Sequence, residues 1–142
     1  MALIRAELNQ SALKGGARLP RRAFELALAE CARSLRPRHD VLLSVAFVGE
    51  REMRKLNREW RGKDRVTDVL SFENVGEILI CYPQAKRQAV ELGHSTRDEV
   101  VFLLVHGVLH VFGHDHERPT DAKRMYSIQT KILTRLGVDP RI

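Results

Sequence analysis

The sequence predicts a single α+β domain, with a central mixed sheet of about four strands surrounded by about five helices. Short apolar runs bounded by glycine, proline and polar residues alternate with longer helical patterns. One helical stretch, residues 100–112, is apolar except for two histidines, which is typical of a helix at the centre of a domain. With 142 residues, 44% of them hydrophobic, the chain can bury one core. We expect residues 1–142 to form one domain around the histidine-bearing helix.

The first part of the chain predicts a strand and a helix. Residues 2–8 alternate loosely between apolar and polar and lead through a loop to a break at Lys14-Gly15-Gly16. Pro20 opens a helix over residues 20–35, because proline suits the first helical turn, and Pro37 ends it. Its buried side is expected to comprise the alanines with Phe24, Leu26, Leu28 and Cys31.

A second strand and helix follow. Residues 41–48 are continuously apolar and rich in β-branched side chains, which predicts a strand covered on both faces. Gly49 ends the strand, and residues 50–60 form the next helix. The residues of this helix that we expect to face the core are Met53, Leu56 and Trp60.

The second half predicts a hairpin and three helices. Strands at residues 69–72 and 77–81 are joined by a short connection, so they should pair. A helix from Pro83 to Leu92 is closed by Gly93, and Thr96 to Glu99 fits a capping box for the histidine-bearing helix. Pro119 leads the last helix to about residue 136, capped by Gly137, with an apolar stripe of Met125, Ile128, Ile132 and Leu136.

The charge, hydropathy and cysteine content of the chain indicate which kind of partner and which cellular location to expect. A net charge of +6 favours a polyanion, nucleic acid rather than membrane, although many basic proteins bind no nucleic acid. No apolar run approaches the ~20 residues of a membrane span, and we expect no signal peptide. Cys31 and Cys81 lack metal-ligand spacing, so we expect buried free thiols and a reducing, cytoplasmic location.

Four of the six histidines lie between residues 106 and 116. His106 and His110 are four residues apart, so they share one helical face, and a turn at Gly113 could bring His116 to the same point. Two imidazoles on an otherwise apolar helix need a polar partner, and one metal ion satisfies both. Three imidazoles with an open fourth position are typical of catalytic zinc, although nickel or copper would also bind.

These residues also match the metzincin protease pattern H-E-x-x-H-x-x-G-x-x-H, with one difference. Gly107 replaces the glutamate that serves those proteases as general base. This difference counts against proteolysis. Of the neighbouring residues, Asp115 either orients a ligand imidazole or forms an ordinary surface turn, and His94 either lines the site or is a plain loop residue.

Two blocks of the sequence match known family patterns. Residues 106–116 fit H-G-x-L-H-x-x-G-[YH]-D-H, and residues 56–72 fit L-N-x-x-[YW]-R-x-x-D-x-x-T-D-V-L-S-F. On these blocks the chain resembles the YbeY-type endoribonucleases, which are bacterial rRNA maturation factors, and the resemblance covers about residues 41–136. It departs from the family at Glu77, where aspartate is usual, and at Glu73, where proline commonly follows the strand.

The resemblance implies a small α+β domain that binds one zinc ion through His106, His110 and His116. It implies hydrolysis of single-stranded RNA, maturation of small-subunit rRNA ends and ribosome quality control. The implied partners are RNA, the small ribosomal subunit and an Era-type GTPase. Arg61 falls on the functional arginine of the family.

The residue chemistry agrees with this role for Arg61. A guanidinium can hold a phosphate with two hydrogen bonds and stabilise charge in the transition state, although a surface ion pair with Asp64 or Asp68 is the simpler alternative. Glu77 and Asp68 are the candidates for the general base. The residues that could line an RNA groove, or form the solvated face of a helix, are Arg51, Arg54, Lys55, Arg58, Lys63 and Arg65.

Three functions therefore compete. We rank a zinc-dependent, single-strand-specific endoribonuclease first. A ribosome-assembly factor with a structural zinc ion, closed by a fourth protein ligand, comes second. A zinc peptidase comes last, because it needs another carboxylate in place of the missing glutamate.

Overall fold

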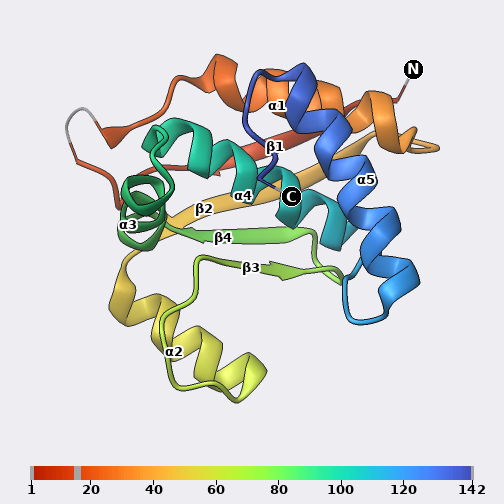
Figure 1. Ribbon diagram of the computed structural model, residues 1–142. Coiled ribbons are helices and arrows are strands. Elements are labelled where there is room, and N and C mark those ends of the chain that lie inside the picture. The colour runs from red at the N-terminus through yellow and green to blue at the C-terminus, as the bar shows by residue number, and fades with distance from the viewer. Residues whose placement is uncertain (1, 15–16, 142) are drawn as a thin grey trace.

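The computed structural model describes residues 2–14 and 17–141. Four strands form one mixed sheet in the order β1-β2-β4-β3 (Figure 1). β1 runs parallel to β2 and β2 parallel to β4, whereas β3 pairs with β4 as an antiparallel hairpin. The strands are β1 (Ile4–Asn9), β2 (Val41–Val48), β3 (Val69–Phe72) and β4 (Glu77–Cys81). The predicted α+β class and the hairpin are confirmed.

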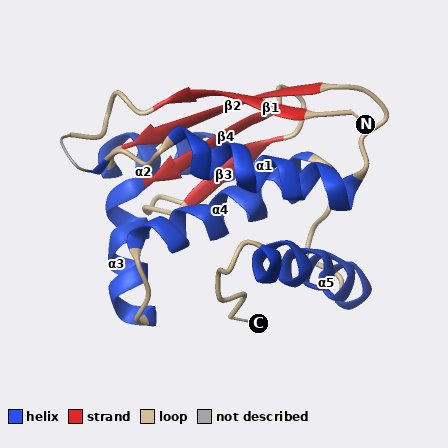
Figure 2. Ribbon diagram, turned by 90° about the horizontal axis from the view of Figure 1, so that it is seen from above, coloured by secondary structure: helices blue, strands red, loops and turns tan. Residues whose placement is uncertain are grey.

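Five helices accompany the sheet in the described part of the chain. Three of them, α1, α4 and α5, lie on one side of the sheet (Figures 1 and 2). α4 contacts α1, α3, α5 and strands β3 and β4, so the predicted central position of the histidine-bearing helix is correct. The helices are α1 (Arg21–Leu35), α2 (Glu50–Arg61), α3 (Tyr82–Leu92), α4 (Thr96–Val111) and α5 (Pro119–Arg135).

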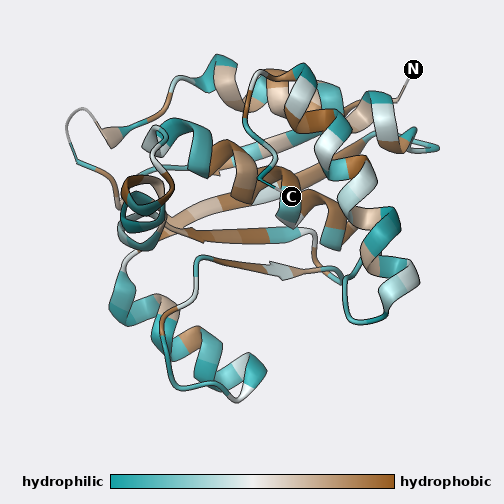
Figure 3. Ribbon diagram, in the orientation of Figure 1, coloured by the Kyte–Doolittle hydropathy of each residue, from teal (hydrophilic) through white to brown (hydrophobic). Residues whose placement is uncertain are grey.

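The core follows the hydropathy of the sequence. Hydrophobic colour gathers on α4 and the strands, whereas α2 is largely hydrophilic (Figure 3). On the helical side of the sheet, α4 buries a continuous apolar surface with α1, α5 and the inner side chains of the strands. A second, smaller cluster lies under α2 on the other side, made of Val48, Met53, Leu70, Leu79 and Cys81.

The second face of the sheet is less covered than the sequence predicts. Leu42 in β2 is 62% exposed, because only α2 packs against that face and it covers the β3–β4 end. Trp60 is 67% exposed at the end of α2, and Leu26 in α1 is 46% exposed. The prediction that these three side chains face the core is therefore wrong.

The two cysteines are free and buried, as predicted. Burial raises the pKa of the Cys31 thiol to about 12, because the thiolate would lose its hydration. No helix among the described residues is both long and apolar enough to cross a bilayer. The predicted break at Lys14-Gly15-Gly16 lies in part outside the described residues.

α4 begins one residue earlier than the predicted capping box implies. The side chain of Ser95, rather than Thr96, accepts a hydrogen bond from the backbone N–H of Asp98. Glu99 does not turn back to the helix start. It is fully buried and accepts hydrogen bonds from Gln88 and His94, which ties α3 and the loop before α4 to the central helix.

Gly107 marks the closest approach of α4 to the sheet. A Cβ atom added at this position would lie 2.9 Å from Cγ2 of Ile78 in β4. Protein interiors do not accommodate a carbon contact this short without displacing a neighbour. The glycine is therefore required by packing between helix and sheet.

Replacing Gly107 by alanine should lower the free energy of unfolding by about 1–2 kcal/mol, although alanine favours a free helix by about 1 kcal/mol. Urea denaturation measures this change. The matched test adds Ile78→Ala, which removes the opposing methyl group, so the cost of Gly107→Ala should shrink in that background. A Gly107→Ala protein at least as stable as the parent would contradict the packing argument.

Candidate metal centre

Three histidines from α4 and the following turn converge. One ring nitrogen from each of His106, His110 and His116 lies within 4.8 Å of the other two. Nε2 of His110 is 3.0 Å from Nε2 of His106. In a tetrahedral zinc site with bonds of 2.0–2.1 Å the nitrogens lie about 3.3 Å apart, so the donor set fits one metal ion with modest adjustment. In the part of the chain that the structure describes, no cysteine or carboxylate joins this group.

The turn after α4 brings His116 to the helix. α4 ends at Val111, and Gly113 adopts a φ of 90°, a left-handed conformation that glycine adopts readily. The reversed chain stacks the His116 ring on Tyr126 of α5, with the planes 11° apart and the centroids 6.0 Å apart. The predicted turn at Gly113 is present, and α5 supports its far side.

Gln129 orients the most buried of the three imidazoles. Nδ1 of His106 donates a hydrogen bond to Oε1 of Gln129 over 2.8 Å, which leaves Nε2 unprotonated and free to bind a metal. Gln129 is fully buried, and its Nε2 atom has no hydrogen-bond partner. A buried amide with one atom unsatisfied is costly, and among the described residues the hydrogen bond to His106 is the one side-chain contact that offsets this cost, which favours a positioning role for Gln129.

Burial keeps two of the imidazoles neutral. It lowers the pKa of His106, and it lowers the pKa of His110 to about 4. The neighbouring imidazoles and the charge of Arg61 lower the pKa of His110 further in the same direction. Neutral imidazoles are the form that binds a metal.

The histidines open into a hollow of about 550 Å³, which we call the metal-site hollow. Arg61, Lys63, Asp68 and Asp115 are among the predicted residues that line it. The sequence analysis did not single out its other lining residues, which are Thr67, Val69, Ser71 and Glu117.

The end of α2 carries Arg61 to this hollow, and the loop that follows carries Asp68. The buried amide of Asn57 donates a hydrogen bond to the carbonyl of Arg65, and Gln88 donates one to Asp68. Asp64 is paired with Arg54 and Arg58 on the outside of the loop. No carboxylate lies within ion-pair distance of Arg61 among residues 2–14 and 17–141, so the structure does not form the surface ion pair that was its alternative role.

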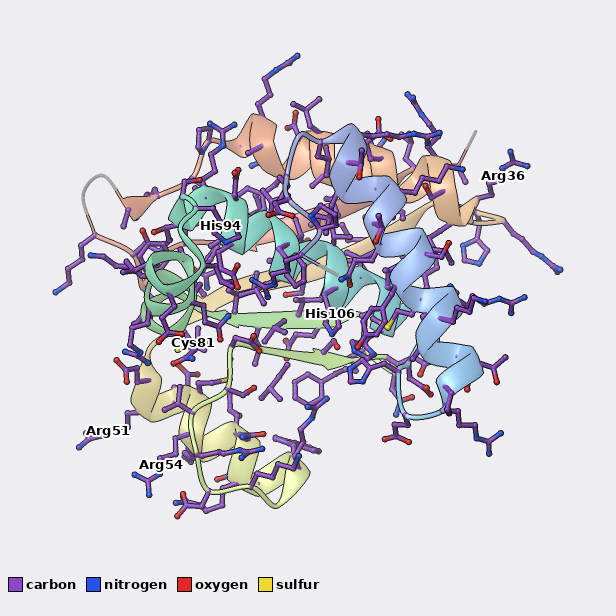
Figure 4. The ribbon with its side chains drawn as sticks, in the orientation of Figure 1. Arg36, Arg51, Arg54, Cys81, His94 and His106 are labelled. Carbon is purple, nitrogen blue, oxygen red and sulfur yellow. The ribbon has the colours of Figure 1, made fainter. Side chains whose placement is uncertain are left out.

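Other predicted site residues lie elsewhere. His94 is held by Glu99, well away from His106 (Figure 4). Glu77 lines a neighbouring hollow on the α2 side of the sheet and does not line the metal-site hollow. Arg51 and Arg54 project outward from α2 (Figure 4), and Lys55 and Arg65 are exposed without lining the hollow.

Sequence reasoning missed Gln129 as a positioning residue. A signal was present, because Gln129 is four residues from Met125 on the apolar side of α5, where a polar side chain must find a partner. Glu99 was missed as a buried residue because its position also fits a capping box.

The comparisons with known proteins identify the class. The family model described as Endoribonuclease YbeY matches residues 9–137, and the chain belongs to this family. The Endoribonuclease YbeY of Limosilactobacillus fermentum is 37% identical over 137 residues, which cover 82% of this chain and 87% of that protein. The protein of the same name from a Sulfurihydrogenibium species is 43% identical over 109 residues, covering 69% and 72%.

Two further similarities concern length and fold. The Endoribonuclease YbeY of Myxococcus xanthus is 44% identical over 110 residues, but the chain spans only 37% of its length. The solution structure of TM1509 from Thermotoga maritima has a TM-score of 0.66 and 31% identity, covering 94% of this chain and 89% of that one. The fold of this chain is therefore similar to that of an experimentally determined structure.

Gln129→Leu should weaken metal binding about tenfold to a hundredfold, because His106 would lose the acceptor that fixes its ring. Gln129→Glu, which keeps the acceptor, should bind zinc at least as tightly as the parent. Competition with a chromogenic chelator measures both affinities, with Ser127→Ala on the same helix as the control. Equal affinity in the leucine variant would exclude the positioning role.

The stability of the metal-free protein should fall as the pH drops from about 6.5 to about 4. The unfolded chain takes up a proton at its ordinary pKa of 6.5, whereas burial keeps His110 neutral in the folded protein to about 4. Above pH 6.5 His110 is neutral in both states and does not reduce the stability of the folded protein. As the pH falls from 6.5 to about 4, protonation of the unfolded chain lowers the free energy of unfolding progressively. Urea denaturation in the presence of a chelator should show a shallower pH dependence for His110→Gln, and identical slopes would contradict this assignment.

Proposed function

We propose that the chain is a zinc-dependent endoribonuclease that cleaves single-stranded RNA, and that residues 1–142 form one metal-dependent hydrolase domain. The observation that carries the proposal is a three-histidine cluster with Arg61 at the wall of the same hollow. The names of the relatives support RNA as the substrate. We infer from the same resemblance that the RNA is rRNA of the small ribosomal subunit, that an Era-type GTPase is a further partner, and that the protein acts in the cytoplasm.

The roles of the residues follow from their chemistry. His106, His110 and His116 would hold the zinc ion, which when bound supplies the Lewis acidity that polarises a phosphodiester and activates water. Arg61 has no carboxylate partner among the described residues, so its guanidinium is available to hold the scissile phosphate. Lys63 adds a second positive charge at the hollow. Arg51, Lys55 and Arg65 are exposed around α2 and could contact the RNA backbone, whereas Arg54 and Arg58 are paired with Asp64.

Asp68 is the better of the two general-base candidates. It lines the metal-site hollow, whereas Glu77 does not. Its carboxylate accepts hydrogen bonds from the backbone of Val69 and from Gln88, which fix its orientation and leave lone pairs for a proton. Asp115 also lines the hollow and could orient a ligand from the solvent side.

The two competing functions lack such support. A structural zinc site needs a fourth protein ligand, and no further histidine, cysteine or carboxylate of the described residues belongs to the cluster. A zinc peptidase needs another carboxylate near the metal in place of the missing glutamate, and position 107 has no room for one because a side chain there would meet Ile78. The matching family model and the relatives are named endoribonucleases, which gives the peptidase no support.

Arg61→Ala should lower the rate of RNA cleavage by about a hundredfold to a thousandfold, because the phosphate loses its charged donor in the transition state. The assay uses highly purified protein, an unstructured RNA, and zinc added or removed with a chelator. His110→Ala and chelation should both abolish cleavage, and Arg22→Ala on the exposed side of α1 should cleave as the parent does.

Cleavage by His110→Ala at the parental rate would identify the activity as a contaminant and overturn the proposal. If Arg61→Ala alone retains full activity, the zinc-dependent reaction stands and the arginine has no part in it.

A further inference from the structure

An aromatic hollow adjoins the metal-site hollow on the α2 side of the sheet. It encloses about 710 Å³ and lies between α2 and the β3–β4 hairpin. Its lining residues are Leu56, Trp60, Ser71, Phe72, Glu73, Asn74, Val75, Glu77 and Leu79. Trp60 is 67% exposed there, and Phe72 packs against it in a T-shaped contact with centroids 5.7 Å apart.

This exposure is unusual for the residue. Large aromatic side chains dominate buried cores and interfaces, so a tryptophan with two-thirds of its surface in water requires an explanation. Phe72 packs against one side of the indole ring, which favours one orientation of the Trp60 side chain. The rest of the ring remains accessible to a ligand.

The two hollows adjoin each other at the edge strand β3. Ser71 lines both of them, and Trp60 directly precedes Arg61, which lines the metal-site hollow. A chain whose phosphate lies against Arg61 can therefore reach the aromatic hollow with a neighbouring nucleotide.

We propose that the aromatic hollow binds one nucleobase of the RNA, stacked on Trp60, next to the nucleotide whose phosphate is cut. This inference rests on the proposed function, and it names a subsite of the substrate. Aromatic side chains beside a basic groove are the usual means of holding single-stranded nucleic acid, since every base presents a π-face. A paired base is stacked within its helix and cannot enter, so this subsite would select single strands.

The charges of the two hollows indicate which part of a nucleotide each one would bind. Arg61 and Lys63 attract the phosphate to the metal-site hollow, whereas Glu77 repels a phosphate from the aromatic hollow. A carboxylate accepts a hydrogen bond from an exocyclic amino group, such as N4 of cytosine, and uracil offers only an acceptor there. The subsite should therefore prefer cytosine to uracil.

An apolar segment of a protein partner could also cover Trp60. RNA is favoured because the aromatic hollow adjoins the hollow that holds Arg61, Lys63 and the metal cluster, and because Trp60 and Arg61 are neighbours in the chain. The experiment below distinguishes the two occupants.

Trp60 is the single tryptophan of the chain, so its fluorescence reports on the subsite directly. The zinc-loaded protein is titrated with short single-stranded oligonucleotides of 2′-O-methyl cytidine or uridine, whose integrity is checked by electrophoresis. Stacking should quench the emission saturably, at lower concentrations of the cytidine oligomer. Glu77→Gln should reduce the difference between the two oligomers.

The second measurement is the KM for cleavage of an unstructured RNA at fixed salt. Trp60→Ala should raise KM about tenfold, which is the range of base–aromatic stacking. Trp60→Tyr, which keeps a stacking ring, should restore most of the loss. Val90→Ala, at an exposed apolar residue on α3 that lines neither hollow, is the matched control.

The outcomes separate this inference from the proposed function. A quench without cleavage by any variant would overturn the nuclease and retain the base subsite. Cleavage without a quench, or an unchanged KM in Trp60→Ala, would overturn the base subsite. A fall in kcat with KM unchanged would mean that Trp60 only supports Arg61, which also overturns stacking.

Discussion

The structure depends on satisfying three polar residues on its most buried helix. Glu99, His106 and His110 lie on one face of α4, seven and four residues apart, where unpaired polar groups would be prohibitively costly. Glu99 and His106 each find a partner from another element, whereas His110 lies against His106 on α4 itself, with their Nε2 atoms 3.0 Å apart. Gln88 of α3 and Arg141 near the C-terminus bind Glu99, and Gln129 of α5 binds His106. The hydrogen bonds that satisfy the buried polar groups of α4 therefore also attach α3, α5 and the C-terminal end of the chain to this helix.

Gln88 extends this polar network to the site. Its side-chain amide donates to both Glu99 and Asp68, so the carboxylate at the metal-site hollow is linked to the buried end of α4. Asn57 holds the other side of the same loop, through the carbonyl of Arg65. The loop that carries the residues facing the histidines is therefore fixed from α2 and from α3, although it has no regular structure of its own. The proposed role of Arg61, which is to hold a phosphate in one orientation, needs this rigidity.

Local patterns in the sequence predicted the elements well, because helix caps, glycine turns and apolar periodicity act over a few residues. The convergence of His106, His110 and His116 followed from spacing and one glycine. The sequence predicted that Leu42 and Trp60 are buried, and both are exposed. An apolar side chain indicates that burial would be favourable, but it does not indicate whether another helix or strand lies close enough to cover it. The basic residues of α2 illustrate the same limit. Arg54 and Arg58 are neighbours of Arg61 in sequence, yet Asp64, folded back from the loop, engages those two and leaves Arg61 free.

Gly107 connects the packing of the domain to its chemistry. In the protease pattern this position holds the glutamate that acts as general base. The glycine found here could be taken as a simple loss of that carboxylate. The contact with Ile78 excludes that interpretation, because any side chain at this position would enter the sheet. With the α4 backbone this close to β4, a proton acceptor cannot come from the residue after His106. The carboxylates that line the hollow come from other segments, namely Asp68 from the loop before β3 and Asp115 and Glu117 from the turn after α4. Under the proposed function, Arg61 would hold the scissile phosphate and Asp68, in the same hollow, would accept the proton. This arrangement suits phosphodiester hydrolysis and favours a nuclease over a peptidase.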